Sequence, residues 1–235
     1  MVKDLNKRTK SAIIVVTVFL IGICFPGAVP LKIAYIFAVL MAITELLVAK
    51  SQTSKTQAAQ DREDAALAVR YEVVILAISG FVIIFLGKAE LILLIIAVCI
   101  TDTGAWLIGK NIGKKFTKTR PFPKISPNKS WEGTIGGILA EILILWFFTH
   151  GKTPTFMQFF IVTTAGVLAV TGDVIGSYTK RCLKIKDSNA YIKGGFAKKC
   201  EKPMNGFGGY LDRIDSLSLV ITVCGIASMT IPFWK

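Results

Sequence analysis

The acidic residues between positions 172 and 216 have types and spacings that could hold a metal ion together with phosphate groups. Asp212 and Asp215 are three residues apart where the last apolar run begins, so on a helix both carboxylates lie on one face. Asp173, near the end of the preceding apolar run, could meet them across a helix interface. Three oxygen ligands, completed by phosphate and water, suit Mg²⁺. The alternative is that Asp212 forms a structural salt bridge with Arg213 or Lys180.

Two adjacent basic residues, Lys180 and Arg181, lie between these aspartates in the sequence and could bind phosphate. On a helix, neighbouring side chains project about 100° apart, so we expect the two to serve different partners. Arginine suits bidentate contacts with phosphate, whereas lysine acts as a movable point charge. The alternative is that both side chains extend to the membrane surface and bind no substrate.

A second group of polar residues surrounds another apolar run. Asp102 lies inside or at the end of that run, where an unpaired charge costs about 2.5–3.5 kcal/mol, so it needs a partner, and Lys129 is the expected one. The turn expected at Ser126 leads into a helix start near Gly133, where backbone amides would point at an anion. Trp131 could stack on a nucleotide base or anchor the chain at the membrane interface.

The elements that must position these residues are membrane helices. Hydrophobic residues make up 53% of the chain and the mean hydropathy is +0.59, too apolar for an ordinary soluble domain. The apolar residues form runs long enough to cross a hydrocarbon core of about 30 Å. The seven expected spans are roughly 12–29, 31–49, 71–87, 89–109, 133–149, 156–174 and 215–234. We therefore expect an all-α polytopic membrane protein, with residues 1–235 as one membrane domain.

The first apolar run is interpreted as a retained span and not as a signal peptide. Lysines and an arginine precede it, but Pro26 and Pro30 follow without a clear small-x-small cleavage site, and a second apolar run starts at once. Residues 50–70 are the most linker-like segment, and their second half is expected to start a short helix at the bilayer surface. Glycines four residues apart, at 109 and 113, 133 and 137, and 172 and 176, fit close approach of helices.

The net charge of +13 is better explained by membrane topology than by nucleic-acid binding. The basic residues gather in the N-terminal tail and in segments 50–70, 110–129 and 180–202, which share one side if seven spans alternate. The positive-inside rule places that side, with the N-terminus and the active site, in the cytoplasm. Attraction to anionic lipids accounts for part of the excess, and binding of an anionic substrate can account for the rest.

Two glutamates inside expected membrane spans, and the cysteines, are not included in the expected site. Glu45 and Glu141 occur within apolar spans, where they could line a polar cavity, be protonated or pair between helices. Five cysteines include no C-x-x-C pair, and a zinc site at Cys182 and Cys200 is disfavoured because the sole histidine, His150, is expected on the far face.

The motifs taken together resemble the phosphatidate cytidylyltransferases, also called CDP-diacylglycerol synthases. The similarity covers about half the chain, residues 99–216, with the motifs in the family's order. The motifs are Asp102-Thr-Gly-Ala, Ile125-Ser-Pro-x-Lys129-x-Trp131-Glu132-Gly133, Ser177-x-x-Lys180-Arg181, Lys186-Asp187 and Gly208-Gly209-x-Leu211-Asp212-Arg213-Ile214-Asp215-Ser216. The family usually has His-Gly-Gly where this chain has Phe207-Gly208-Gly209, and segment 188–206 contains an insert. The resemblance makes 99–235 the catalytic part, while residues 1–98 add only hydropathy.

The resemblance implies that CTP and phosphatidic acid react to give CDP-diacylglycerol and pyrophosphate. Mg²⁺ would be held by Asp173, Asp212 and Asp215, and a second cation such as K⁺ is allowed. The residues expected to act on the phosphates are Asp173, Lys180, Arg181, Asp212 and Arg213. The residues expected to shape substrate binding are Asp102, Ser126, Lys129, Trp131, Glu132, Ser177 and Asp187. The expected setting is a bacterial inner membrane, with membrane lipids as surroundings, no nucleic acid, and a homodimer as the assembly to test.

Two other functions stay open. One is a different CTP-using lipid enzyme, such as a CDP-archaeol synthase or a polyprenol kinase. The other is an inactive or diverged relative that acts as a lipid-binding or scaffold membrane protein, which Phe207 and the insert would favour. A transporter is disfavoured because the acids concentrate at one membrane face.

Overall fold

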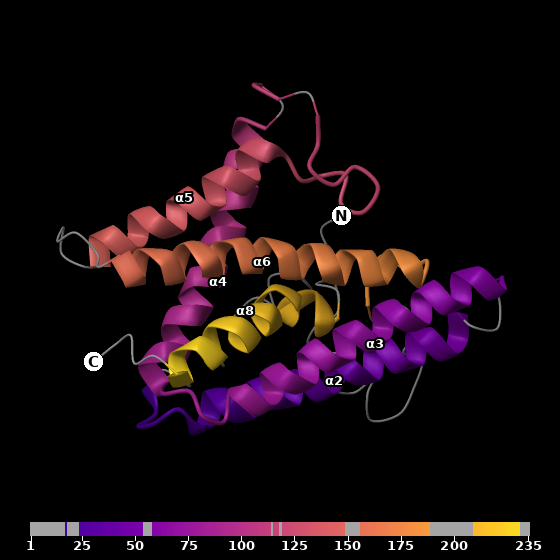
Figure 1. Ribbon diagram of the computed structural model, residues 1–235, viewed down its shortest axis with the longest axis horizontal. Coiled ribbons are helices and arrows are strands. Elements are labelled where there is room, and N and C mark those ends of the chain that lie inside the picture. Colours follow the sequence, from indigo (N-terminus) through magenta and orange to yellow (C-terminus); the bar gives the residue numbers. More distant parts are fainter. Residues whose placement is uncertain are drawn as a thin grey trace. The chain divides into compact units, whose positions relative to one another are not determined.

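Six helices make up the regular structure of the residues that the computed structural model describes, and these residues contain no strand (Figure 1). The structure describes residues 17, 24–53, 58–113, 115–117, 119–148, 156–188 and 209–230. The helices are α2 (Val29–Thr53), α3 (Ala59–Val82), α4 (Lys88–Asn111), α5 (Trp131–Phe148), α6 (Phe156–Cys182) and α8 (Leu211–Thr230). The prediction of an all-α integral membrane protein is confirmed.

Each described helix overlaps an expected span. Among the residues that the structure describes, four helical segments are long and apolar enough to cross a membrane: 29–53, 59–82, 88–111 and 159–182. Helices α5 and α8 occupy the positions expected for two more spans, 133–149 and 215–234. Nearly all of the first expected span, 12–29, lies outside the described residues. The number of seven spans therefore stays a prediction.

A helix starts in the second half of segment 50–70, as expected, but it is not a short separate helix, because α3 begins at Ala59 and continues into the expected span. The charged residues near its start include Asp61, and acidic side chains in a first turn interact favourably with the helix dipole. Ala65, Ala68 and Val69 are buried, so this half of the helix packs against the protein like the rest of α3. A surface helix of its own is not formed.

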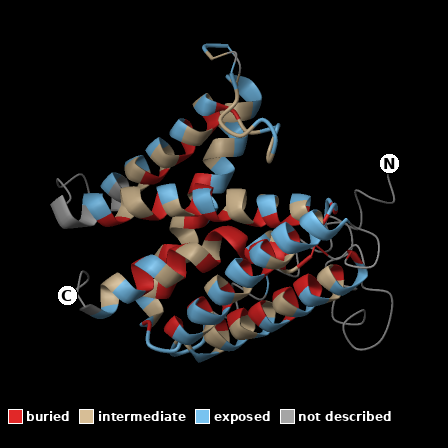
Figure 2. Ribbon diagram, turned by 45° about the vertical axis from the view of Figure 1, so that its right-hand side comes forward, coloured by how far each residue is buried: buried red, intermediate tan, exposed pale blue. Residues whose placement is uncertain are grey.

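The chain divides into two compact units, and the first unit comprises residues 1–84 and 178–215. Within it α2 and α3 form an antiparallel pair, with Tyr35 donating a hydrogen bond to Ser79 at 2.9 Å. Buried residues follow one side of each helix, and Leu46 and Leu76 are among the most buried (Figure 2). The last turn of α6 and the first turn of α8 complete this unit.

The end of α6 is a tight C-terminal cap. The amide of Ile185 donates to the carbonyl of Lys180 at 3.0 Å, and Lys184 adopts a φ of 55°. A residue in the left-handed region with a bond of this kind is the usual way in which a helix ends and the chain reverses. Residues 185–188 are thereby turned toward the start of α8, where Ser188 contacts Asp212.

The second unit comprises residues 85–177 and 216–235, and its centre is the close packing of α4 against α5. A Cβ atom at Gly133 would lie 2.7 Å from the carbonyl oxygen of Ala105, and one at Gly137 would lie 2.5 Å from that of Thr101. These distances leave no room for a side chain, so the two backbones touch. The expectation that the glycines at 133 and 137 allow close helix approach is confirmed.

Candidate functional site

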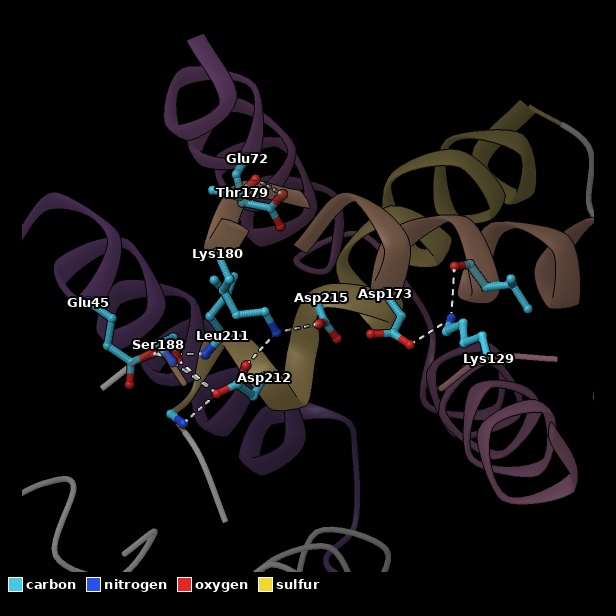
Figure 3. Close-up of polar contacts among 12 residues, drawn as sticks. Glu45, Glu72, Lys129, Asp173, Thr179, Lys180, Ser188, Leu211, Asp212 and Asp215 are labelled. Atoms are coloured by element: carbon cyan, nitrogen blue, oxygen red, sulfur yellow. Dashed lines mark hydrogen bonds and ion pairs between the residues drawn. The ribbon is translucent and has the colours of Figure 1, made fainter. Parts of the chain in front are cut away.

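A buried lysine lies between two aspartates in the first unit, and we call Lys180, Asp212 and Asp215 the Lys180 cluster (Figure 3). The Nζ atom of Lys180, near the end of α6, is 2.5 Å from Oδ1 of Asp212 and 3.7 Å from Oδ2 of Asp215. The three side chains are 10%, 14% and 7% exposed. The expectation that the two aspartates share one helix face is confirmed, and so is the alternative pairing of Asp212 with Lys180.

The second oxygen of Asp212 is held by backbone amides. Gly209 donates to Oδ2 at 2.8 Å, and the amide of Ser188 donates to it at 3.2 Å. Burial would raise the pKa of the Asp212 carboxyl, but the charge and hydrogen bond of Lys180 and the two amides outweigh it, so the pKa lies below its ordinary value. Asp212 is therefore a fixed carboxylate, and three of its roughly four acceptor sites are in use.

Glu45, which sequence reasoning left out, belongs to the surroundings of this cluster. Its side chain comes from α2 and is 1% exposed. One carboxylate oxygen accepts the amide of Tyr210 at 2.7 Å, and the other accepts the amide of Leu211 at 3.1 Å and the hydroxyl of Ser188 at 2.6 Å. The signal in the sequence was an acid inside an apolar span, which indicates that a partner exists without saying which.

A second glutamate of the first unit also approaches the Lys180 cluster. Glu72, from α3, is 1% exposed and accepts a hydrogen bond from the Thr179 hydroxyl at 3.5 Å. Thr179 precedes Lys180 on α6, and the Glu72 carboxylate interacts electrostatically with that lysine. Helices α2 and α3, where the motifs gave no guidance, thus each direct one buried carboxyl group toward the cluster.

The second unit holds another lysine–aspartate pair, beside a cavity. The Nζ atom of Lys129 lies 2.7 Å from Oδ2 of Asp173 and 3.5 Å from the carbonyl oxygen of Val170 (Figure 3). The expected ion pair of Lys129 with Asp102 is corrected by this geometry, because Asp173 on α6 presents its carboxylate to the lysine instead. Asp102 still faces Lys129 electrostatically, and both aspartates line the cavity.

The cavity has a volume of about 450 Å³ and lies among α4, the loop before α5, the start of α5, and α6. Its lining combines acids, bases and small residues, including Asp102, Trp106, Lys110, Ser126, Lys129 and Asp173. The ammonium group of Lys110 lies 5.0 Å from the centre of the Trp106 ring, so a cation and an aromatic face meet at the wall. The volume is within the range of small-molecule sites, roughly 300–1,000 Å³.

Two residues expected at the nucleotide side lie next to this cavity but do not line it. Oε1 of Glu132 accepts the amides of Thr117 at 2.6 Å and Phe116 at 3.3 Å, so its carboxylate fixes the preceding loop. Trp131 begins α5 with 43% of its surface exposed. This exposure is compatible with the membrane-interface alternative for Trp131.

The remaining expected site residues are placed as follows. Arg181, Asp187 and Arg213 are exposed in the first unit, and Arg213 interacts electrostatically with Asp212 and Asp215. Ser177 is half-buried on α6 and belongs to the second unit. Phe207, Gly208 and most of the insert at 188–206 lie outside the described residues.

The described residues fit a metal ion that arrives with phosphates better than one held by protein alone. Among them, no three carboxylate, imidazole or thiol groups converge to hold an ion. The Lys180 cluster offers two carboxylates, and the cavity of the second unit offers two more. Mg²⁺ is commonly bound through one or two carboxylates plus substrate phosphates. The predicted site of Asp173, Asp212 and Asp215 stays a prediction.

The family model and the curated relatives that match this chain agree on one family. A sequence model described as the cytidylyltransferase family matches residues 2–230. The chain is 35% identical over 142 residues to the phosphatidate cytidylyltransferase of Haemophilus influenzae, covering 57% of this chain and 44% of that relative. It is 35% identical over 133 residues to the enzyme of that name from Helicobacter pylori, covering 56% and 44%. The chain thus spans about half the length of the curated relatives that it matches. This chain belongs to the cytidylyltransferase family.

Proposed function

We propose that the chain transfers the CMP moiety of CTP to phosphatidic acid. A phosphate oxygen of phosphatidic acid attacks the α-phosphorus of CTP. The bond from that phosphorus to the oxygen bridging toward the β-phosphate breaks, and pyrophosphate leaves with the bonding electrons. The products are CDP-diacylglycerol and pyrophosphate. The attacking oxygen is already anionic near neutral pH, so the protein's main task is to bring two polyanions together and neutralise their charge.

The observation that carries this proposal is the charged cavity of the second unit. A space of about 450 Å³ lined by Lys129, Lys110, Asp102 and Asp173 offers cations for phosphates and carboxylates for their counter-ion. The Trp106 ring and the Ser126 hydroxyl in its wall can contact a base or a sugar. Lys129 is held in place by Asp173 and the carbonyl of Val170, so it meets an incoming phosphate without having to be ordered first.

The Lys180 cluster is proposed to act on the phosphates as well. Asp212 is fixed by three hydrogen bonds, and it holds Lys180 in a single position between two carboxylates. Arg181 follows Lys180 in the sequence and Arg213 follows Asp212. Both arginines are exposed and can attract anionic groups. Mg²⁺, which Asp173, Asp212 and Asp215 are proposed to bind, would neutralise negative charge on the phosphates of CTP when bound. A second cation such as K⁺ is compatible with this scheme.

The proposed setting is the bacterial inner membrane with the site on the cytoplasmic side. The helices are those of an integral membrane protein, and the basic residues gather in segments that the positive-inside rule places in the cytoplasm. CTP would arrive from the cytoplasm, and phosphatidic acid would enter sideways from the inner leaflet. A homodimer stays a prediction.

The test is an assay of the purified protein in detergent with CTP, Mg²⁺ and a panel of lipid acceptors. We expect lipid-linked CMP to form with phosphatidic acid. Transfer only to an archaeal ether lipid, or phosphorylation of a polyprenol, would assign the chain to a different CTP-using enzyme. An inactive relative would form no product, and CTP with Mg²⁺ would not raise its unfolding temperature, because only a ligand that binds the native state stabilises it.

A further inference from the structure

The start of α8 is held by one carboxylate of its own first turn, Asp212, and by one from another helix, Glu45 of α2. Three consecutive amides at this end are each bound by a carboxylate: that of Gly209 by Asp212, and those of Tyr210 and Leu211 by Glu45. The first amides of a helix have no partner within the helix, so another group must satisfy them. Here two carboxylates do so, and a negative charge at this end is also favoured by the helix dipole. These amides are therefore not free to bind the phosphates of a substrate.

Glu45 and Asp212 are linked through a shared neighbour. The Ser188 hydroxyl lies 2.6 Å from Oε2 of Glu45 and 3.2 Å from Oδ2 of Asp212. A hydroxyl has one proton, and the shorter distance favours its donation to Glu45. The backbone amide of Ser188 then donates a hydrogen bond to Oδ2 of Asp212 at 3.2 Å. Ser188 is 2% exposed, so a single buried residue contacts both carboxylates.

Gly209 shows how tightly this arrangement is built. A Cβ atom added there would collide with the Ser188 hydroxyl and with the Glu45 carboxylate. The residue is buried, and only a residue without a side chain leaves room for both groups. Three segments far apart in the sequence, at 45, 188 and 209–212, thus meet at one point, and the Asp212 carboxylate is oriented from that point (Figure 3).

We infer that Glu45 is a positioning residue for the transfer reaction: through the first turn of α8 and Ser188 it sets the orientation of the Asp212 carboxylate, and hence the place of Lys180. The inference rests on the proposed function. Glu45 contacts Tyr210, Leu211 and Ser188, which lie beside Asp212 in space or in the sequence. Its role is to keep Asp212 where Lys180 can meet it at 2.5 Å.

The test is Glu45→Gln, with Glu141→Gln as the matched control. Glu141 is 2% exposed, lies on α5 in the second unit and accepts a hydrogen bond from Thr101 at 2.7 Å. It is as buried as Glu45, but it belongs neither to the Lys180 cluster nor to the lining of the 450 Å³ cavity. Glutamine keeps one acceptor oxygen but turns an NH₂ group toward backbone donors. A displacement of about 1 Å at a reacting group can cost roughly 100-fold, so we expect Glu45→Gln to lower kcat by about 10- to 100-fold.

Two readouts and one further variant separate positioning from a general loss of stability. KM for CTP should stay within about two-fold of the wild-type value, because the change acts on the reacting geometry and not on uniform binding. Hydrogen exchange of the amides at 209–212 should become about ten-fold faster, with the middle of α8 unchanged. Ser188→Ala, which removes only the linking hydroxyl, should show the same pattern with a smaller fall in kcat. If Glu45→Gln does not fold, Ser188→Ala replaces it as the test variant.

The inference is overturned if Glu45→Gln keeps kcat within about two-fold of wild type, or if Glu141→Gln loses as much. If the wild-type protein transfers no CMP, the proposed function has failed. Hydrogen exchange at 209–212 then decides by itself whether Glu45 fixes the start of α8, and unchanged exchange refutes it.

Discussion

Replacing Lys180 by methionine should destabilise the protein far more than the same replacement at Lys184. Both lysines form one close ion pair with an aspartate of the first unit, at 2.5 Å to Asp212 and at 2.7 Å to Asp61. The pairs differ in burial: Lys180 and Asp212 are 10% and 14% exposed, whereas Lys184 and Asp61 are 62% and 46% exposed. Methionine keeps most of the apolar stem, so the comparison isolates the charge.

The magnitudes follow from burial. Removing one partner of a fully buried pair costs about 3–5 kcal/mol, because the other charge is left without compensation. Asp212 would keep two amide hydrogen bonds and is not fully buried, so we expect about 2 kcal/mol for Lys180→Met, below that range. An exposed pair contributes about 0–1 kcal/mol, and Lys184→Met should stay within it.

The measurement is the free energy of unfolding of the three proteins in one detergent, from denaturant titration followed by circular dichroism. Activity is a second readout: Lys180→Met should lose CMP transfer, while Lys184→Met should keep it. Equal losses of stability in the two variants would refute the statement that the Lys180 cluster is a buried, coupled unit.

Three further predictions concern packing, pH and the cavity. Gly137→Ala should lower the free energy of unfolding by about 1–3 kcal/mol, because its Cβ would lie 2.5 Å from the Thr101 carbonyl oxygen. Gly80→Ala should be nearly neutral, because the nearest atom to its Cβ would be 3.6 Å away. Thermal unfolding of both variants tests this difference. Because the pKa of Asp212 is lowered in the folded state, its stabilising contribution should be complete above the ordinary carboxyl value of about pH 4 and be lost as the pH falls through the lowered pKa. A stability difference between wild type and Asp212→Asn that disappears already near pH 6 would contradict this. Lys129→Met should raise KM for CTP by about ten-fold, the effect of losing about 1.4 kcal/mol of binding; an unchanged KM would remove Lys129 from the nucleotide site.

Much of the helical framework could be predicted from the sequence, because long apolar runs have few alternatives to a membrane helix. The run expected at 31–49 became α2, and that expected at 89–109 became α4, with ends shifted by a few residues. The first half of α3 was expected as a short helix of its own, and its continuity with the following span was not. Its polar and charged residues resemble a linker, and only the burial of Ala65 and Val69 against the rest of the first unit shows why they continue the helix.

The site was predictable to the extent that it depends on helix periodicity. Asp212 and Asp215 were expected on one face, and Lys180 was named, beside Arg213, as an alternative salt-bridge partner of Asp212. Pairings between distant segments were not predictable: Lys129 forms its ion pair with Asp173 and not with Asp102. Glu45 was named in the sequence but left outside the site for another reason. Its partners are mostly backbone amides, which every residue but proline carries, so no residue type in the sequence marks them.

The most direct test of the central claim is CMP transfer to phosphatidic acid by Asp212→Asn, beside wild type and the control Asp61→Asn. Asp61 forms an exposed pair in the same unit, so its variant reports any general effect of losing an aspartate. We predict that Asp212→Asn expresses and folds but loses turnover by at least about 100-fold, in keeping with the loss of a preorganised charged group, while Asp61→Asn behaves as wild type. Full activity in Asp212→Asn would contradict the assignment of this carboxylate to the reaction.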